Sequence, residues 1–175
     1  MGRDKAALLV EGEPLWQRQL NILRETRPRE LFISGPFNGP YAHSGFKVIP
    51  DRESDQGPLG GIAASLEACQ SEWLLVLAVD LPKIPLRFLE RMLGEVVGTG
   101  VGIVPSIEGR HLEPLVAVYP KKALALAEAH RTAGKLKLGH FVSELKREGW
   151  VRELPVSAAE RDIFTNWNAP EDLLG

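Results

Sequence analysis

The chain contains an unbroken apolar run, Trp73-Leu74-Leu75-Val76-Leu77-Ala78-Val79, which stops at Asp80-Leu81-Pro82. A run of this length without polar alternation is typical of a strand that is buried on both faces, as in a parallel sheet covered by helices. We therefore predict that residues 73–79 form a central strand of an α/β fold.

Helical and strand-like segments alternate on both sides of this run. Apolar residues at helical spacing predict helices, and short apolar runs that end at turn residues predict strands. The predicted helices are residues 14–24, 59–69, 86–97, 121–130, 136–147 and a short one opening at 170–172; the predicted strands are 31–33, 46–49, 101–104, 114–119 and 150–154. This order predicts a three-layer, mostly parallel, Rossmann-like sheet with helices on both faces. No repeat or linker interrupts residues 1–175, which predicts a single domain.

Composition narrows the possible partners. The net charge is only −2 and 44% of the residues are hydrophobic, so the sequence shows neither a basic surface for nucleic acid nor a membrane-binding one. No apolar run is long enough to span a bilayer, and the N-terminus lacks a signal-peptide hydrophobic region. Cys69 is the only cysteine, which excludes an internal disulfide and fits a reducing compartment. We expect a cytoplasmic protein whose partner is a small molecule.

The most informative polar residue is Asp80, which follows the buried run directly. Ligands of open parallel sheets bind at the carboxyl ends of the strands. A carboxylate at this place can hold a hard cation that bridges nucleotide phosphates. Capping the next turn or helix is an equally good interpretation of this segment alone.

Three further features suggest ligand contacts, each with a simpler alternative. Residues 51–61 form a loop in which Gly57-Pro58-Leu59-Gly60-Gly61 precedes a helix, although such turns are frequent without any ligand. Lys5 on its own is most simply a solvated charge. Asn166 and Asn168 bracket Trp167, so that in an extended segment both amides face one way, but Asn168 also suits a turn before Pro170. The histidines have neither metal-ligand spacing nor a neighbouring nucleophile.

Six short segments stand in a specific order along the chain: Met1-Gly2-Arg3-Asp4-Lys5, Val48-Ile49-Pro50-Asp51, Gly57-Pro58-Leu59-Gly60-Gly61-Ile62, Val79-Asp80-Leu81-Pro82, Glu113-Pro114-Leu115-Val116-Ala117-Val118-Tyr119 and Asn166-Trp167-Asn168-Ala169-Pro170-Glu171-Asp172-Leu173. Together they resemble the molybdenum cofactor guanylyltransferases, the molybdopterin-guanine dinucleotide biosynthesis protein A family. The resemblance spans nearly the whole chain.

This resemblance implies a nucleotidyltransferase that moves GMP from GTP to molybdenum-molybdopterin with release of pyrophosphate. It implies that Lys5 and Asp80 are catalytic, that Asp80 binds Mg²⁺ and GTP, and that Lys5 contacts the GTP phosphates. It also places Asp51 and the Gly57-Pro58-Leu59 segment at the nucleotide. Asn166 and Asn168 match the asparagine pair on the molybdopterin side. Other molybdenum cofactor biosynthesis proteins are possible partners.

The sequence departs from the family pattern at its beginning. Members of the family begin with an apolar strand and a Leu-Ala-Gly-Gly type loop, whereas this sequence begins at the methionine of the following segment. The N-terminal strand and glycine loop are therefore missing, which would leave two neighbouring strands with unpaired amides and carbonyls. We expect that Met1 is an internal methionine of a longer natural chain.

Two other functions share the same machinery. A cytidylyltransferase of molybdopterin or a sugar-phosphate nucleotidyltransferase would use the same metal and phosphate contacts. A nucleotide-binding protein without turnover is the alternative from outside the enzymes, because backbone donors of the missing loop would be lost.

Overall fold

The computed structural model describes residues 5–50 and 57–167. Its elements follow in the order η1 (Lys5–Ala7), β1 (Leu9–Val10), β2 (Glu13–Pro14), α1 (Leu15–Glu25), β3 (Phe32–Ser34), β4 (Lys47–Ile49), α2 (Gly57–Ala68), β5 (Trp73–Leu77), α3 (Leu86–Thr99), β6 (Gly102–Ile107), β7 (His111–Leu112), β8 (Val116–Pro120), α4 (Ala123–Thr132), α5 (Leu138–Arg147), β9 (Val151–Val156) and η2 (Ala158–Phe164). Each predicted helix and strand within the described residues is present, with ends shifted by a few residues. The helix predicted at 170–172 lies outside them.

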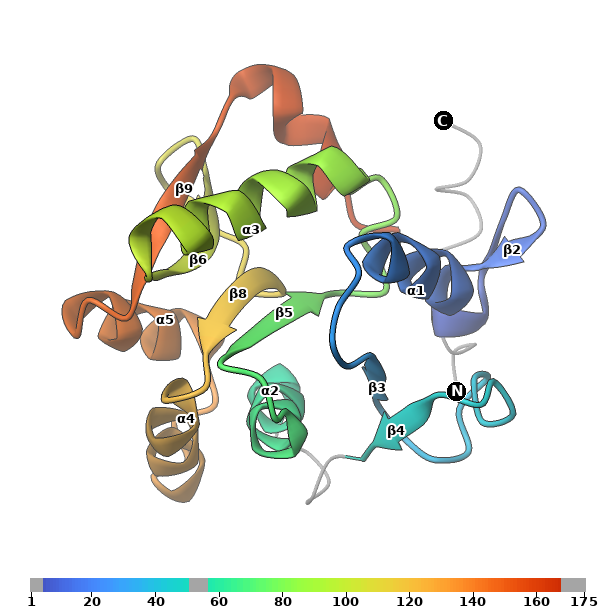
Figure 1. Cartoon of the computed structure of the whole chain (residues 1–175), viewed down its shortest axis with the longest axis horizontal. Coiled ribbons are helices and arrows are strands. Elements are labelled where there is room, and N and C mark those ends of the chain that lie inside the picture. The colour runs from blue at the N-terminus through green and yellow to red at the C-terminus, as the bar shows by residue number, and fades with distance from the viewer. Residues whose placement is uncertain (1–4, 51–56, 168–175) are drawn as a thin grey trace.

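The elements form three layers, as Figure 1 shows. Helices α1 and α3 cover one face of the sheet, and α2, α4 and α5 cover the other. Strand residues alternate between the two hydrophobic cores: Leu74 packs with α2 and α4, whereas Leu75 packs toward α3. The predicted α/β class with helices on both faces is confirmed.

The sheet is mixed, but among the described residues β5, β6 and β9 run in one direction and only β8 and the two-residue β7 run against them. The expectation of a mostly parallel sheet is therefore confirmed, with β8 as the main exception. The five-stranded sheet has the order β5-β8-β6-β7, with β9 also paired to β6. Strand β8 is antiparallel to both β5 and β6, β7 is antiparallel to β6, and β9 is parallel to β6. An unbroken apolar run reports burial on both faces and carries no information about strand direction.

Strand β5 lies at the edge of this sheet, so the prediction of a central strand is wrong for the described residues. It pairs with β8 alone, and β3 pairs in parallel with β4 in a separate two-stranded sheet. A groove separates β3 from β5 where a further strand would join the two sheets. The groove lies between the two helix layers, since α1 and α2 both contribute to its lining. Within the described residues, β3 and β5 therefore face each other across the groove without pairing.

The groove consists of two adjoining cavities of about 230 and 480 Å³. The smaller is lined by Leu31 and residues 73–75, and the larger by residues 33–35 and 76–80, while Phe32 lines both. The earlier residues of both strands line the smaller cavity, and the later residues of both line the larger one. Strands β3 and β5 therefore run parallel to each other across the groove.

The sequence explains where α1 and α3 begin and where α3 ends. Pro14 and Pro85 stand immediately before α1 and α3, where a residue with no backbone N–H costs nothing. Gly100 ends α3 with a φ of 65°, a left-handed conformation that glycine adopts readily.

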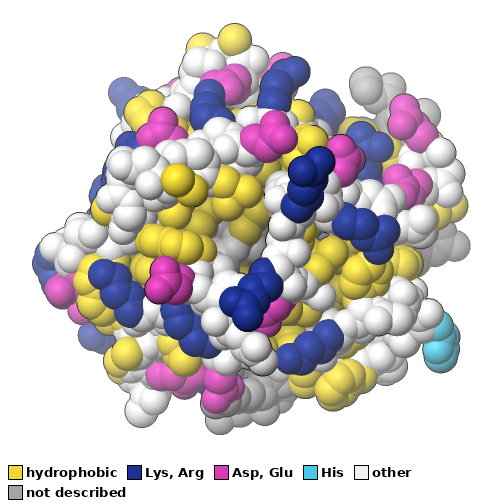
Figure 2. Space-filling model, in the orientation of Figure 1, with side chains coloured by type: hydrophobic (Ala, Val, Ile, Leu, Met, Phe, Trp, Pro, Cys, Tyr) yellow, Lys and Arg dark blue, Asp and Glu magenta, His cyan; other side chains and the backbone are white. Residues whose placement is uncertain are grey.

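Figure 2 shows apolar side chains in the middle of the same view, surrounded by charged ones. Within the described residues, no helix has both the length and the apolar character needed to cross a membrane.

Candidate functional site

Two residues that the sequence predicted to act together lie side by side. Asp80 follows β5 and Lys5 begins η1, and the Lys5 Nζ is 3.8 Å from the Asp80 Oδ2. The Asp80 side chain is 25% exposed and that of Lys5 is 49% exposed, so both remain accessible to a ligand. The chain thus brings a cation and a carboxylate together at the carboxyl end of its most apolar strand.

The backbone around Asp80 is held from three sides. Its carbonyl accepts a hydrogen bond of 2.8 Å from the Trp167 N–H, and the neighbouring Ala78 N–H donates to the Leu115 carbonyl at 2.8 Å. From α1, the Gln19 side chain donates to the carbonyls of Ala78 and Leu81. The Asp80 carboxylate itself accepts no backbone hydrogen bond in the described residues, and α3 has no side-chain cap. The structure therefore argues against the capping interpretation of Asp80.

Asp80 and Ala6 line the larger cavity between β3 and β5. The wall on the α1 side includes Trp16, Gln19 and Leu20, and the wall on the α2 side includes Pro58. The lining is predominantly apolar, with Asp80 at the end of β5. Such a cavity can receive a flat, largely uncharged group while a cation carried by the same ligand reaches the carboxylate.

The glycine loop contributes less than its sequence suggested. Gly57 and Pro58 are exposed at the start of α2, and Gly57 has a φ of 56°. Leu59, in contrast, is completely buried in the core, so it does not face the cavity in this structure. Asp51 lies outside the described residues.

The C-terminal segment reaches the site through Trp167. The Trp167 N–H bonds Asp80, and the Lys83 Nζ lies 5.7 Å from the centroid of the indole, a distance at which a cation–π interaction forms. Asn166 is exposed and directly precedes Trp167, whose bond to Asp80 brings the Asn166 backbone close to Asp80 in space. Asn168 lies outside the described residues, so the predicted pairing of the two amides stays a prediction.

Glu113 is a second carboxylate near the site that the sequence reasoning did not assign. Burial raises its pKa, and the charge of Asp80 raises it further, while a hydrogen bond from the Leu115 N–H lowers it. The completely buried Tyr119 lies close by and donates its hydroxyl to the Pro114 carbonyl at 2.8 Å, and burial raises the pKa of its phenol. In the sequence, Glu113 and Tyr119 stood out only as part of the segment from Glu113 to Tyr119 that carries the family resemblance.

The donor set fits Mg²⁺ better than a metal held by protein alone. No group of three or more His, Cys, Asp or Glu side chains that could hold an ion occurs in residues 5–50 and 57–167. Mg²⁺ commonly takes one or two carboxylates from a protein and completes its shell with water and substrate phosphates. An accessible Asp80 carboxylate that accepts no backbone hydrogen bond offers such a ligand.

Comparisons with known proteins identify the family of this chain. The model of the MobA-like NTP transferase domain family matches residues 1–148. A probable molybdenum cofactor guanylyltransferase from Opitutus terrae is 36% identical over 98% of this chain and 86% of its own length. Another from Pelotomaculum thermopropionicum is 35% identical over 99% of this chain and 84% of its own.

Solved structures share the fold at lower identity. Molybdopterin-guanine dinucleotide biosynthesis protein A from Archaeoglobus fulgidus superimposes with a TM-score of 0.78 and 23% identity, covering 99% of this chain and 88% of that one. A 2-C-methyl-D-erythritol 4-phosphate cytidylyltransferase from Thermus thermophilus gives a TM-score of 0.72 at 19% identity, covering 97% and 90%. With its site geometry, its family match and these relatives, the chain belongs to the MobA-like NTP transferase domain family.

Proposed function

We propose that this chain is a molybdenum cofactor guanylyltransferase, which transfers GMP from GTP to molybdenum-molybdopterin and releases pyrophosphate. The observation that supports this most directly is the Lys5–Asp80 pair, of which Asp80 lines the cavity between β3 and β5. The relatives at 35–36% identity are named for the same activity. We further propose that it acts in the cytoplasm, with other molybdenum cofactor biosynthesis proteins as partners.

The chain's own residues would act by positioning and by charge. Asp80 would hold Mg²⁺, which neutralises negative charge on the triphosphate when it is bound. The Lys5 ammonium, now 3.8 Å from that carboxylate, is placed to contact the phosphates and to stabilise the charge that builds up on the leaving pyrophosphate. Attack by the terminal phosphate of molybdopterin on the α-phosphorus then requires no covalent enzyme intermediate.

The remaining predicted residues would orient the two substrates. Asp51, Gly57 and Pro58 are proposed to contact the nucleotide, while the completely buried Leu59 would anchor the start of α2 in the core. Asn166 and Asn168 are proposed to hold molybdopterin, on the side of Asp80 where Trp167 is anchored. Holding both anions in line lowers the barrier mainly by removing the entropy of bringing them together.

The test is direct conversion of substrates by the purified chain. Incubation with GTP, Mg²⁺ and molybdenum-molybdopterin should release pyrophosphate and form the guanine dinucleotide, both measured by chromatography. Replacing GTP with CTP should give no product. Product from CTP alone would identify a cytidylyltransferase instead, and binding of GTP without any product would identify a nucleotide-binding protein without turnover.

A further inference from the structure

Gln19 is a buried polar side chain in α1 to which the proposed reaction gives no role. It is 4% exposed and lies between core residues of the helix, where a leucine or methionine would be the ordinary choice. Its Nε2 donates two hydrogen bonds, to the carbonyl of Ala78 at 2.8 Å and to the carbonyl of Leu81 at 2.9 Å. Both donor hydrogens of the amide are therefore used on the backbone of one turn.

The two acceptors lie on either side of Asp80. Strand β5 ends at Leu77, so residues 78–81 are outside the ladder and the carbonyls of Ala78 and Leu81 have no strand partner there. A single amide nitrogen that bonds both carbonyls fixes the distance between the two ends of the turn. The direction in which the Asp80 carboxylate leaves the turn depends on that distance.

The orientation of the Gln19 amide is determined by these contacts. Reversing the amide would place its oxygen against two carbonyl oxygens, which repel it, so the nitrogen must face the turn. The Oε1 is then left buried and without a hydrogen-bond partner in the described residues. A buried acceptor without a donor is unfavourable, and an apolar side chain would avoid this cost. Packing therefore does not explain a glutamine here, whereas its two donors do.

We propose that Gln19 is a positioning residue, which holds the Ala78–Leu81 turn so that the Asp80 carboxylate is presented to a nucleotide-bound divalent cation. This rests on the proposed function, because it assumes that Asp80 binds the cation. Neighbouring contacts act on the same turn: Arg18 Nε donates to the Pro82 carbonyl at 3.3 Å, and the Trp167 N–H bonds Asp80 itself. Gln19 is the contact that spans both ends.

The test separates cation binding from folding. Mn²⁺ is titrated against GTP with and without the full chain, and free Mn²⁺ is followed by electron paramagnetic resonance. The difference between the two titrations measures binding at the protein, and Tm is measured in parallel. Gln19→Met removes both donors at similar volume and should weaken Mn²⁺ affinity by about 10-fold or more, the usual effect of losing a group that orients a metal ligand. Gln17→Met is the matched control, since Gln17 is an exposed glutamine of the same helix, and should leave the affinity unchanged.

A second variant keeps the test decisive if Gln19→Met does not fold. Gln19→Asn retains a buried amide but withdraws its nitrogen by one methylene, so it should also lose Mn²⁺ affinity. A folded Gln19→Met or Gln19→Asn protein with parental Mn²⁺ affinity would overturn the positioning role while leaving the proposed function intact. Absence of Mn²⁺ binding by the parent in the presence of GTP would overturn both.

Discussion

The carboxylate of Asp80 forms an ion pair with Lys5 and accepts no hydrogen bond from the backbone of the described residues. A side chain in such surroundings is held in place by the turn that bears it and stays available to a ligand. Sequence reasoning identified both partners because a carboxylate after a buried strand and a lysine near the N-terminus match a known pattern. It overlooked Gln19 and Glu113, because the role of an uncharged or isolated polar residue depends on what the fold places beside it.

Replacing Asp80 by asparagine should remove most of the activity. The substitution keeps the shape of the side chain but takes away the charge that binds the cation, so kcat should fall by about 100-fold or more, the scale of losing one preorganised electrostatic contact. Pyrophosphate release measures the loss, and circular dichroism should show an unchanged fold. Glu90→Gln on the exposed face of α3 is the control and should retain full activity. Parental activity of Asp80→Asn would contradict the assigned cation site.

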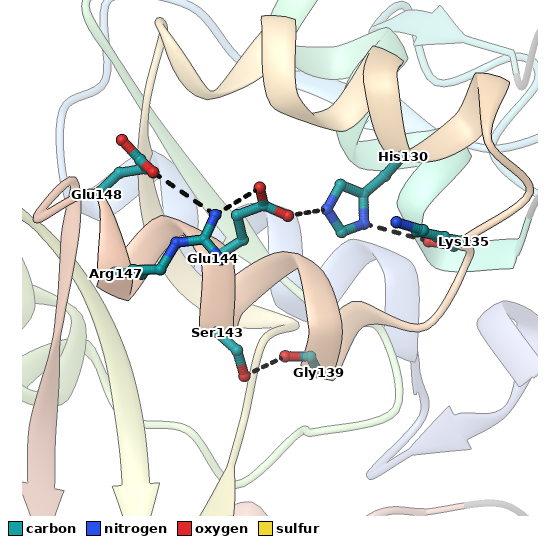
Figure 3. A network of polar contacts seen from close by, with 7 residues as sticks. All are labelled: His130, Lys135, Gly139, Ser143, Glu144, Arg147 and Glu148. Carbon is teal, nitrogen blue, oxygen red and sulfur yellow. Dashed lines mark hydrogen bonds and ion pairs between the residues drawn. The ribbon is translucent and has the colours of Figure 1, made fainter.

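The buried His130 joins α4 to α5 through a polar network remote from Asp80 in the sequence. Figure 3 shows its ring between the Glu144 carboxylate and the Lys135 carbonyl. Its Nε2 is 2.7 Å from the Glu144 Oε2, and its Nδ1 is 3.3 Å from the Lys135 carbonyl oxygen. Both neighbours are hydrogen-bond acceptors, so the ring satisfies both only when each nitrogen carries a proton.

This network should make part of the stability depend on pH. The hydrogen bond with His130, and then the charge of Arg147, lower the pKa of Glu144 below the usual value of 4.5. A carboxyl group whose pKa is lowered by folding stabilises the protein above its unfolded pKa, and this contribution is lost as the pH falls through the folded pKa. Glu144→Gln should therefore lower Tm at neutral pH, and the difference from the parent should shrink as the pH falls below 4.5. Glu148→Gln, at the same end of α5, is the control; a gap that stays constant with pH would contradict the assignment.

At the scale of elements, helix α2 ends against a lysine from a distant part of the chain. The Lys121 Nζ donates to the carbonyls of Leu66, Glu67 and Cys69, at 3.0 Å for Glu67. The last carbonyls of a helix lack partners within the helix and carry partial negative charge, so a cation there is stabilising. Since Lys121 follows β8 directly, this contact ties α2 to the central sheet.

Lys121→Met should therefore lower the free energy of unfolding by about 1–2 kcal/mol, the range for a partly buried cation at a helix C-terminus. Urea denaturation followed by circular dichroism measures the change. Lys135→Met removes an exposed lysine from the loop between α4 and α5 and serves as the control. Equal midpoints for the two variants would show that the α2 cap contributes nothing.

The elements also show what sequence periodicity can and cannot predict. Long amphipathic segments such as α1 and α3 were predicted closely, because burial of one face sets their period. The β1–β2 hairpin was missed, since its strands have two residues each and its turn uses Glu11 and Gly12 with positive φ of 52° and 85°. The direction of β8 was missed as well, because pairing partners are chosen by the whole sheet.

For the whole molecule, the groove between β3 and β5 leaves the outer edge of β5 without a strand partner in the described residues. In an antiparallel pair, successive residues point their backbone groups alternately toward and away from the partner. The Glu72 carbonyl and the Ala78 N–H both bond the β8 side, so Leu74 and Val76 also face β8. The backbone N–H and carbonyl groups of Trp73, Leu75 and Leu77 therefore point toward the groove.

Amide hydrogen exchange should reveal this alternation. The amides of Leu75 and Leu77 should exchange faster than those of Leu74 and Val76, because only the latter pair donates to β8. Residue-resolved exchange by nuclear magnetic resonance measures the contrast within one strand, and Ala117 and Tyr119 of β8, which pair with Val76 and Leu74, provide the protected reference. Equal protection along β5 would mean that its outer edge is bonded in solution.

The position of that edge between α1 and α2 affects how the protein can aggregate. An open strand edge is a template for pairing with another molecule, but here α1 and α2 stand over it on both sides. A second copy can reach the edge only if one of these helices moves aside, and each is tied down: α1 through the hydrogen bonds of Gln19 and α2 through those of Lys121. Aggregation of this protein on heating should therefore require that α1 or α2 first leaves the groove.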